Sequence, residues 1–117
     1  MSRREITAYE AMALFKKRRT AFVIADTYKD LELVREKFNL REGAVRMMDM
    51  NDFYPMLMRY GAAKELREIA KRYDGAVIIC PHGKSSKAFV DTIAEHGAEA
   101  HSLAGGLDGL RGQLTFI

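Results

Sequence analysis

The sequence predicts a single α/β domain, residues 1–117, with a central, mainly parallel sheet of about four or five strands and helices on both faces. Two apolar runs, 21–25 and 76–79, are continuous, which is typical of parallel strands that are buried on both faces. Segments with helical periodicity separate the predicted strands, so right-handed crossovers should join them. A chain of 117 residues with 48% hydrophobic content can build one core and is too short for two ordinary domains.

The first half of the chain alternates predicted strands with predicted helices. Thr7 and Glu10 form a capping box, in which two side chains satisfy free backbone N–H groups at a helix start. Asp26 and Thr27 follow an apolar strand and are expected to cap the helix after it. In order, the predicted elements are an edge strand near Ile6, a helix at 8–17, a strand at 21–25, a helix ending near 38–39 and a strand at 44–48.

The second half continues the alternation. In the helix predicted at 62–73, apolar residues recur at spacings of three and four and form one stripe. Gly97 is expected to end the following helix, and Gly105 with Gly106 permits a turn that larger residues could not make at low cost. The predicted elements are a helix at 62–73, a strand at 76–79, a helix at 86–96, a strand at 98–103 and a short helix around 107–110.

A methionine-rich segment, Met47–Tyr60, lies between the two halves. It contains five methionines and three aromatic residues. Pro55 argues against an uninterrupted helix in the residues that precede this proline. Methionine fills irregular gaps and adapts to varied ligands, so the segment could fill the core or form a wall of a site. Core packing is the favoured role, and the lining role stays open.

The net charge of +3 is concentrated in Arg3-Arg4 and in Lys16–Arg19. A solvated chain end and a helix C-terminus whose cations complement the helix dipole explain both clusters. Without interleaved aromatic residues or a recognised motif, a nucleic-acid partner is not expected. The chain has no apolar run long enough to span a bilayer and no signal-peptide core, so we expect no membrane partner and a cytoplasmic location.

Cys80 stands at the carboxyl end of the predicted strand 76–79, and it is the only cysteine of the chain. An isolated cysteine is more often a buried apolar residue than a nucleophile. Here, however, a turn containing Gly83 and the start of a helix follow it, an arrangement in which backbone N–H groups and the helix dipole favour a thiolate. Lys84 adds a nearby cation. The sequence therefore predicts a reactive cysteine in a loop that binds an anion at the sheet edge where α/β proteins hold ligands.

The polar residues near Cys80 have simpler roles as well. His82 could act as a base for Cys80, but adjacent loop positions usually project their side chains outward, so it is expected to shape the loop or to line the substrate rim. Ser85 and Ser86 are expected to cap the helix, with their hydroxyls as secondary anion donors. Asp26 is most simply a helix cap, although its strand end shares an edge with Cys80. His82 has neither a second thiolate nor a histidine at metal-ligand spacing, so no metal is expected.

The segment Cys80–Ser86 resembles the active-site loop of rhodanese-type sulfurtransferases, in the Cys-x-His-Gly-x-Ser-Ser form of the small single-domain thiosulfate sulfurtransferases. Ser102–Leu107 resembles the C-terminal Leu-x-Gly-Gly turn of the same family. The resemblance implies one rhodanese-like domain over residues 1–117. Where the family often has Asp-x-Arg after the second strand, this chain has Asp26-Thr27-Tyr28, so the acid is kept and the arginine is absent.

The resemblance also implies a reaction. Cys80 would be the catalytic residue, taking sulfane sulfur from thiosulfate or a similar small anionic donor and carrying it as a persulfide. The substrate-binding residues would be Pro81, His82, Gly83, Lys84, Ser85 and Ser86, with Asp26 behind them. The chain has no second cysteine to form an internal disulfide, so the persulfide would react with an external acceptor. This acceptor would be cyanide, a thiol compound or the thiol of another protein. No organic cofactor or metal is needed.

Two other functions stay open. The domain could be a persulfide carrier or a regulatory module that binds a protein partner without turning over. It could also be a cysteine-dependent phosphatase. That chemistry is typical of a Cys-x5-Arg motif, and here Ser86 occupies the position of the arginine that would bind the phosphate. Turnover with small acceptors favours the enzyme, whereas a stable persulfide in a specific protein complex favours the carrier.

Overall fold

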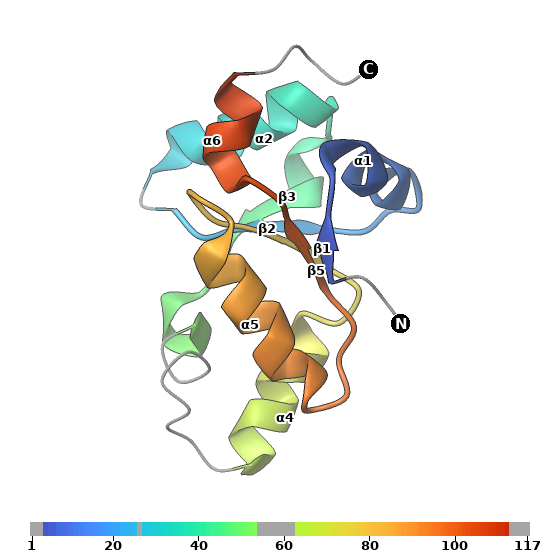
Figure 1. Cartoon of the computed structure of the whole chain (residues 1–117), viewed down its shortest axis with the longest axis vertical. Helices are drawn as coiled ribbons and strands as arrows, with labels where there is room; N and C mark the ends of the chain where they lie inside the picture. Colours follow the sequence, from blue (N-terminus) through green and yellow to red (C-terminus); the bar gives the residue numbers. More distant parts are fainter. Residues whose placement is uncertain (1–3, 26, 54–62, 113–117) are drawn as a thin grey trace.

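The computed structural model describes residues 4–25, 27–53 and 63–112, and Figure 1 shows how their elements are arranged. They form one five-stranded sheet in the order β1-β5-β4-β2-β3, in which every neighbouring pair is parallel. The strands are β1 (Glu5–Ile6), β2 (Ala21–Val23), β3 (Val45–Met47), β4 (Val77–Ile79) and β5 (His101–Leu103). The predicted α/β class, with a parallel sheet of about four or five strands, is confirmed.

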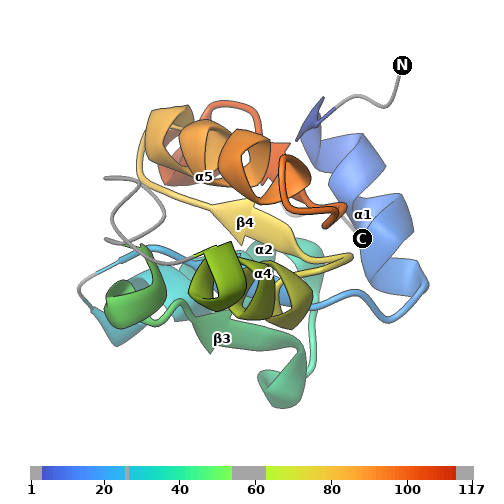
Figure 2. The ribbon, with the colours of Figure 1, turned by 90° about the horizontal axis from the view of Figure 1, so that it is seen from below.

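Helices cover both faces of this sheet (Figures 1 and 2). One face packs against α1 (Ala8–Lys16), α2 (Tyr28–Phe38) and α6 (Gly106–Arg111), and the other against α4 (Ala63–Arg72) and α5 (Lys84–Ala94). A short 3-10 helix, Glu42–Ala44, precedes β3. In β4 all three residues are buried, as a continuous apolar run predicts for a central parallel strand.

The period-two alternation of β4 decides which way the cysteine faces. Val77 and Ile79 belong to the core beneath α1, α2 and α6, whereas Ile78 belongs to the core beneath α4 and α5. Cys80 comes two residues after Ile78 and joins the same core, with 1% of its surface exposed. The sulfur therefore lies on the α5 side of the sheet, at the end of β4.

Several predicted caps and boundaries are confirmed, and others are wrong. The capping box of Thr7 and Glu10 is present, and α2 ends at Phe38, followed by Asn39 in the left-handed conformation. Thr27 is the N-cap of α2 but makes no side-chain cap hydrogen bond. Asp26 lies outside the described residues. Two strands are shorter than predicted: 21–25 forms a strand only at Ala21–Val23, and 98–103 only at His101–Leu103.

The described part of the methionine-rich segment contributes to the α4 and α5 core. Met48 and Phe53 are buried there, whereas 37% of Met47 is exposed on the edge strand β3. Asp52 is buried nearby, where it accepts a hydrogen bond from the Tyr73 hydroxyl (2.9 Å) and pairs with Arg72. Burial raises the pKa of Tyr73 to about 12, and the hydrogen bond to Asp52 adds to this shift. Core packing is thus confirmed for residues 48 and 53, and residues 54–60 lie outside the described part.

Among the described residues, no helix combines the length and the apolar composition that a membrane span requires.

Candidate active site

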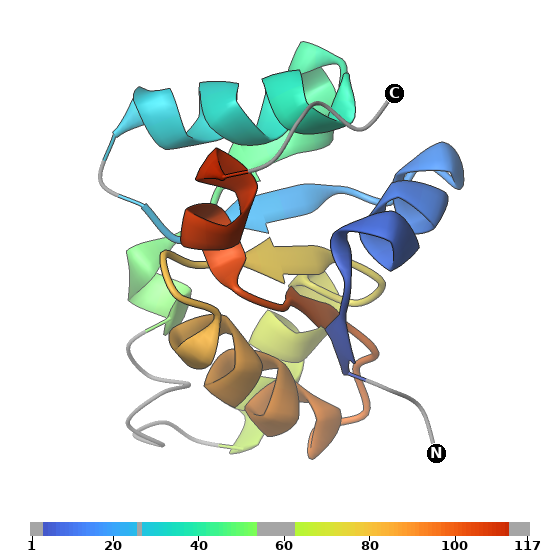
Figure 3. The ribbon, with the colours of Figure 1, turned by 45° about the horizontal axis from the view of Figure 1, so that its top comes forward.

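The carboxyl ends of β2, β4 and β5 meet at one edge of the sheet, and three loops follow them there. Figure 3 shows the loop after β4 and the helix α6, which begins after β5, at the same edge. α2 begins at this edge after β2. The structure thus brings Cys80–Gly83, the Gly105-Gly106 turn and the start of α2 together, at the edge where parallel α/β sheets hold their ligands.

The Cys80 sulfur lies in a ring of hydrogen-bond donors. The backbone N–H of Gly83 donates to it with an N to S distance of 3.0 Å, and that of Ser86 donates at 3.3 Å. The thiol lies 3.2 Å from Ser86 Oγ, to which it can donate when it carries its hydrogen. Gly83 has φ of +87°, a conformation that other residues rarely adopt, and this bend turns its N–H inward. Two converging N–H groups stabilise a negative charge on the sulfur.

Ser86 has a different role from the predicted one. Helix α5 begins at Lys84 rather than at residue 86, and its N-cap is Gly83, so neither Ser85 nor Ser86 caps it. The chain can begin the helix two residues earlier because glycine tolerates the left-handed cap conformation. Ser86 is fully buried in the first turn, and its Oγ lies 2.6 Å from Ser102 Oγ, which is also fully buried. Ser85 is half-buried.

The turn after β5 supports the cysteine loop through its backbone. The Leu107 N–H donates to the Cys80 carbonyl (2.9 Å), and the Asp108 N–H donates to the Pro81 carbonyl (3.0 Å). These bonds require close contact at Gly106, where a Cβ would overlap the Cys80 carbonyl oxygen and lie 2.8 Å from the Gly83 nitrogen. The two sequence motifs therefore form one structure, in which the Gly-Gly turn fixes the backbone of the loop.

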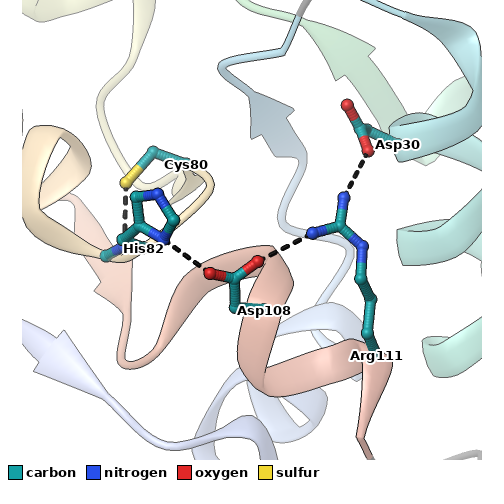
Figure 4. A network of polar contacts seen from close by, with 6 residues as sticks. Asp30, Cys80, His82, Asp108 and Arg111 are labelled. Carbon is teal, nitrogen blue, oxygen red and sulfur yellow. Dashed lines mark hydrogen bonds and ion pairs between the residues drawn. The ribbon is translucent and has the colours of Figure 1, made fainter.

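A polar network joins the loop to two helices, as Figure 4 shows. His82 Nδ1 lies 2.5 Å from Asp108 Oδ2. Arg111 donates from Nη1 to Asp108 Oδ1 (2.7 Å) and from Nη2 to Asp30 Oδ1 (3.0 Å). His82 is 72% exposed, whereas Asp30 on α2 is only 20% exposed. The network anchors the exposed imidazole to α6 and, through α6, to α2.

Sequence reasoning missed four residues of this site: Asp30, Ser102, Asp108 and Arg111. Asp108 and Arg111 are three residues apart on one helix, so their pairing was accessible from the sequence. Asp30 and Ser102 gave weaker signals, an acid in the first turn of α2 and a polar residue within a buried strand. Only the topology brings them to Arg111 and Ser86.

The remaining predicted residues occupy the surface of the site. Pro81 and Lys84 are exposed, and Lys84 forms no ion pair with any described residue. Its position in the first turn of α5 keeps its cation close to the loop. Within the described ranges there is no group of three or more His, Cys, Asp or Glu residues that could hold a metal ion.

The Ser86–Ser102 pair offers a direct test of how the site is held. Ser86→Ala leaves the Ser102 hydroxyl buried without this partner, whereas in Ser102→Ala the Ser86 hydroxyl keeps its contact with the Cys80 sulfur. Each single variant should lose about 1–3 kcal/mol in the free energy of unfolding, with the larger loss in Ser86→Ala. The double variant Ser86→Ala/Ser102→Ala removes both polar groups, and its loss should be smaller than the sum by about 1 kcal/mol. Urea unfolding of the four proteins measures this coupling. Strictly additive losses would mean that the two hydroxyls do not depend on each other.

A search of family models, of curated proteins and of solved structures finds no match to this chain.

Proposed function

We propose that the protein is a sulfurtransferase that moves sulfane sulfur from thiosulfate or a similar donor to a thiophilic acceptor through a persulfide on Cys80. The observation that carries this proposal is the pair of backbone N–H groups, from Gly83 and Ser86, that converge on the Cys80 sulfur at the N-terminus of α5. A cysteine that only filled the core would need no oriented donors. The resemblance of Cys80–Ser86 to the rhodanese loop supplies the direction of the chemistry.

The first half-reaction uses this geometry directly. The Cys80 thiolate attacks the outer sulfur of thiosulfate, a new S–S bond forms to Cys80, and the S–S bond of thiosulfate breaks. The electron pair of that bond leaves with sulfite, and Cys80 keeps a persulfide with one negative charge. The N–H groups that stabilise the thiolate can then stabilise the persulfide, because the negative charge stays at the same helix N-terminus.

Access to the sulfur is controlled by the loop itself. Only 1% of Cys80 is exposed, whereas Pro81, His82 and Lys84 are exposed around it. The donor approaches across these residues and displaces part of the loop to reach the sulfur. Lys84 contributes positive charge to this approach, which favours a dianionic donor over a neutral one.

Intact-protein mass spectrometry tests the proposal. The chain has one cysteine, so a gain of one sulfur atom after mixing with thiosulfate, removed again by cyanide, assigns the persulfide to Cys80 without peptide mapping. Lys84→Met should slow persulfide formation by about fivefold at low salt, the size of one exposed charge interaction. Lys87→Met, also exposed on α5 but one turn further from the loop start, is the matched control and should react at the wild-type rate. If neither thiosulfate nor polysulfide adds sulfur to the wild-type protein, the sulfurtransferase proposal is wrong.

The burial of Cys80 also favours a second candidate, a persulfide carrier that binds a protein acceptor. A buried persulfide is shielded from small thiols and would persist until a partner opens the loop. Steady-state formation of thiocyanate from thiosulfate and cyanide separates the two roles. Many turnovers per protein support the enzyme, whereas one sulfur per protein that small acceptors remove slowly supports the carrier.

A further inference from the structure

His82 lies in an exposed loop, yet polar contacts fix the orientation of its imidazole ring. Its Nδ1 lies 2.5 Å from Asp108 Oδ2, and the other oxygen of Asp108 accepts from Arg111 at 2.7 Å. Arg111 in turn donates to Asp30 at 3.0 Å. The four side chains belong to three separate segments of the chain, which are the cysteine loop, α6 and α2 (Figure 4). Such a network restricts the imidazole to one orientation and gives each oxygen of Asp108 a hydrogen-bond partner.

This arrangement also decides where the proton of a neutral imidazole lies. A carboxylate accepts hydrogen bonds and cannot donate them, so His82 carries its hydrogen on Nδ1 to bond with Asp108. Nε2 then has the free lone pair and can accept a proton. When it does, Asp108 stabilises the imidazolium that forms. His82 and Asp108 together are therefore equipped as a base and its positioning residue, at the exposed face of the loop that surrounds Cys80.

We propose that His82 is the general base of the second half-reaction, in which an acceptor thiol takes the sulfur, and that Asp108 is its positioning residue. This inference depends on the proposed sulfurtransferase function and adds the class of acceptor to it. His82 precedes Gly83, whose N–H contacts the Cys80 sulfur, so the imidazole is placed at the rim that an acceptor must cross.

Nε2 of His82 takes the proton of the acceptor thiol, and the resulting thiolate attacks the outer sulfur of the Cys80 persulfide. An S–S bond forms to the acceptor, while the S–S bond to Cys80 breaks and its electron pair returns to Cys80 as a thiolate. The N–H groups of Gly83 and Ser86 receive that thiolate. The acceptor leaves as a persulfide and can take the proton back from His82, which resets the base.

Other titratable groups around the imidazole are less suited to this role. Asp108 and Asp30 both accept hydrogen bonds from Arg111, so one oxygen of each carboxylate is already occupied. Lys84, on α5, and Arg111, on α6, are cations at neutral pH and have no lone pair to accept a proton. Among the described residues of this edge, His82 is thus the side chain that combines a free nitrogen lone pair with a fixed orientation.

Single-turnover sulfur transfer separates this role from a structural one. The full-length protein is first loaded with sulfur, confirmed by mass, and then mixed at pH 8 with either 2-mercaptoethanol or sulfite. At this pH the thiol is still mostly protonated and must lose a proton, whereas sulfite is mostly the dianion and has none to lose. His82→Ala should slow transfer to 2-mercaptoethanol by about 100-fold and leave transfer to sulfite within twofold of wild type. Asp108→Ala should give a smaller loss with the same acceptor preference, and Asp108→Glu should restore part of the rate. His96→Ala, in the turn after α5 at the far end of that helix, is the matched control.

The pH dependence of transfer to 2-mercaptoethanol is a further test, because a purely structural role of His82 would not change it. Raising the pH ionises 2-mercaptoethanol without a base, so the rate of His82→Ala should approach that of wild type above pH 9.

The measurements distinguish failure of the base role of His82 from failure of the sulfurtransferase function. Equal slowing of sulfite and thiol transfer in His82→Ala would show that the imidazole only shapes the loop, and would overturn the base role. Wild-type rates with 2-mercaptoethanol in His82→Ala would overturn it too, while persulfide formation in the same protein would leave the sulfurtransferase function intact. If the wild-type protein gains no sulfur in the loading step, both proposals fail together.

Discussion

Cys80→Ser is expected to abolish persulfide formation and sulfur transfer, lowering the rate by about 10⁴-fold or more, as removal of a catalytic nucleophile does in other enzymes. Serine offers an oxygen at nearly the same place, so the N–H groups of Gly83 and Ser86 keep a hydrogen-bond acceptor. Its hydroxyl does not ionise near neutral pH, and it cannot form an S–S bond to the donor. Thiocyanate production from thiosulfate and cyanide measures the loss.

The same variant also shows whether the site survives without the sulfur. Because serine and cysteine are close in size and the polar surroundings remain, the free energy of unfolding should change by no more than about 2 kcal/mol. Urea unfolding provides this control. A well-folded Cys80→Ser that still transfers sulfur would place the reaction elsewhere. A variant that loses both activity and fold would instead mark Cys80 as a core residue.

The strand and loop that carry Cys80 could be predicted from sequence because their signals are local. A continuous apolar run indicates a buried parallel strand, and the glycine after it indicates the turn. Strand limits were less accurate, because apolar residues mark burial rather than pairing. Ala98 and Ala100 are buried in the core although neither belongs to β5, which begins at His101.

The polar framework of the site could not be predicted in the same way, because it depends on residues that are distant in sequence. Asp30 and Arg111 are 81 residues apart, and only the strand order that places β2 and β5 on either side of β4 brings α2 and α6 together. The helix-cap role predicted for Ser86 is wrong for a related reason. Its local pattern is that of a helix cap, whereas the partner of its hydroxyl is Ser102, which lies on β5.

Gly106→Ala is expected to have the largest effect on stability, with a loss of about 4 kcal/mol or more in the free energy of unfolding. Gly106 has φ of +57°, where a Cβ is strained. A Cβ there would also overlap the Cys80 carbonyl oxygen and lie 2.8 Å from the Gly83 nitrogen and 2.9 Å from the Pro81 carbonyl oxygen. All three atoms are backbone, so they cannot move aside as a flexible side chain could. The loop must shift away from α6 or the turn must open.

Gly109→Ala is the matched control, since it lies on the same helix three residues further along. A Cβ at Gly109 would meet the Ala104 carbonyl oxygen at 3.8 Å, an ordinary contact, and alanine favours the helix by up to about 1 kcal/mol over glycine. Gly109→Ala should therefore equal or exceed the wild-type stability, and urea unfolding compares the two variants directly. Any shift of the loop in Gly106→Ala also breaks the bonds from the Leu107 and Asp108 N–H groups, so the variant should form persulfide slowly even below its unfolding transition. Equal stability of Gly106→Ala and Gly109→Ala would show that the Gly-Gly turn does not hold the cysteine loop in place.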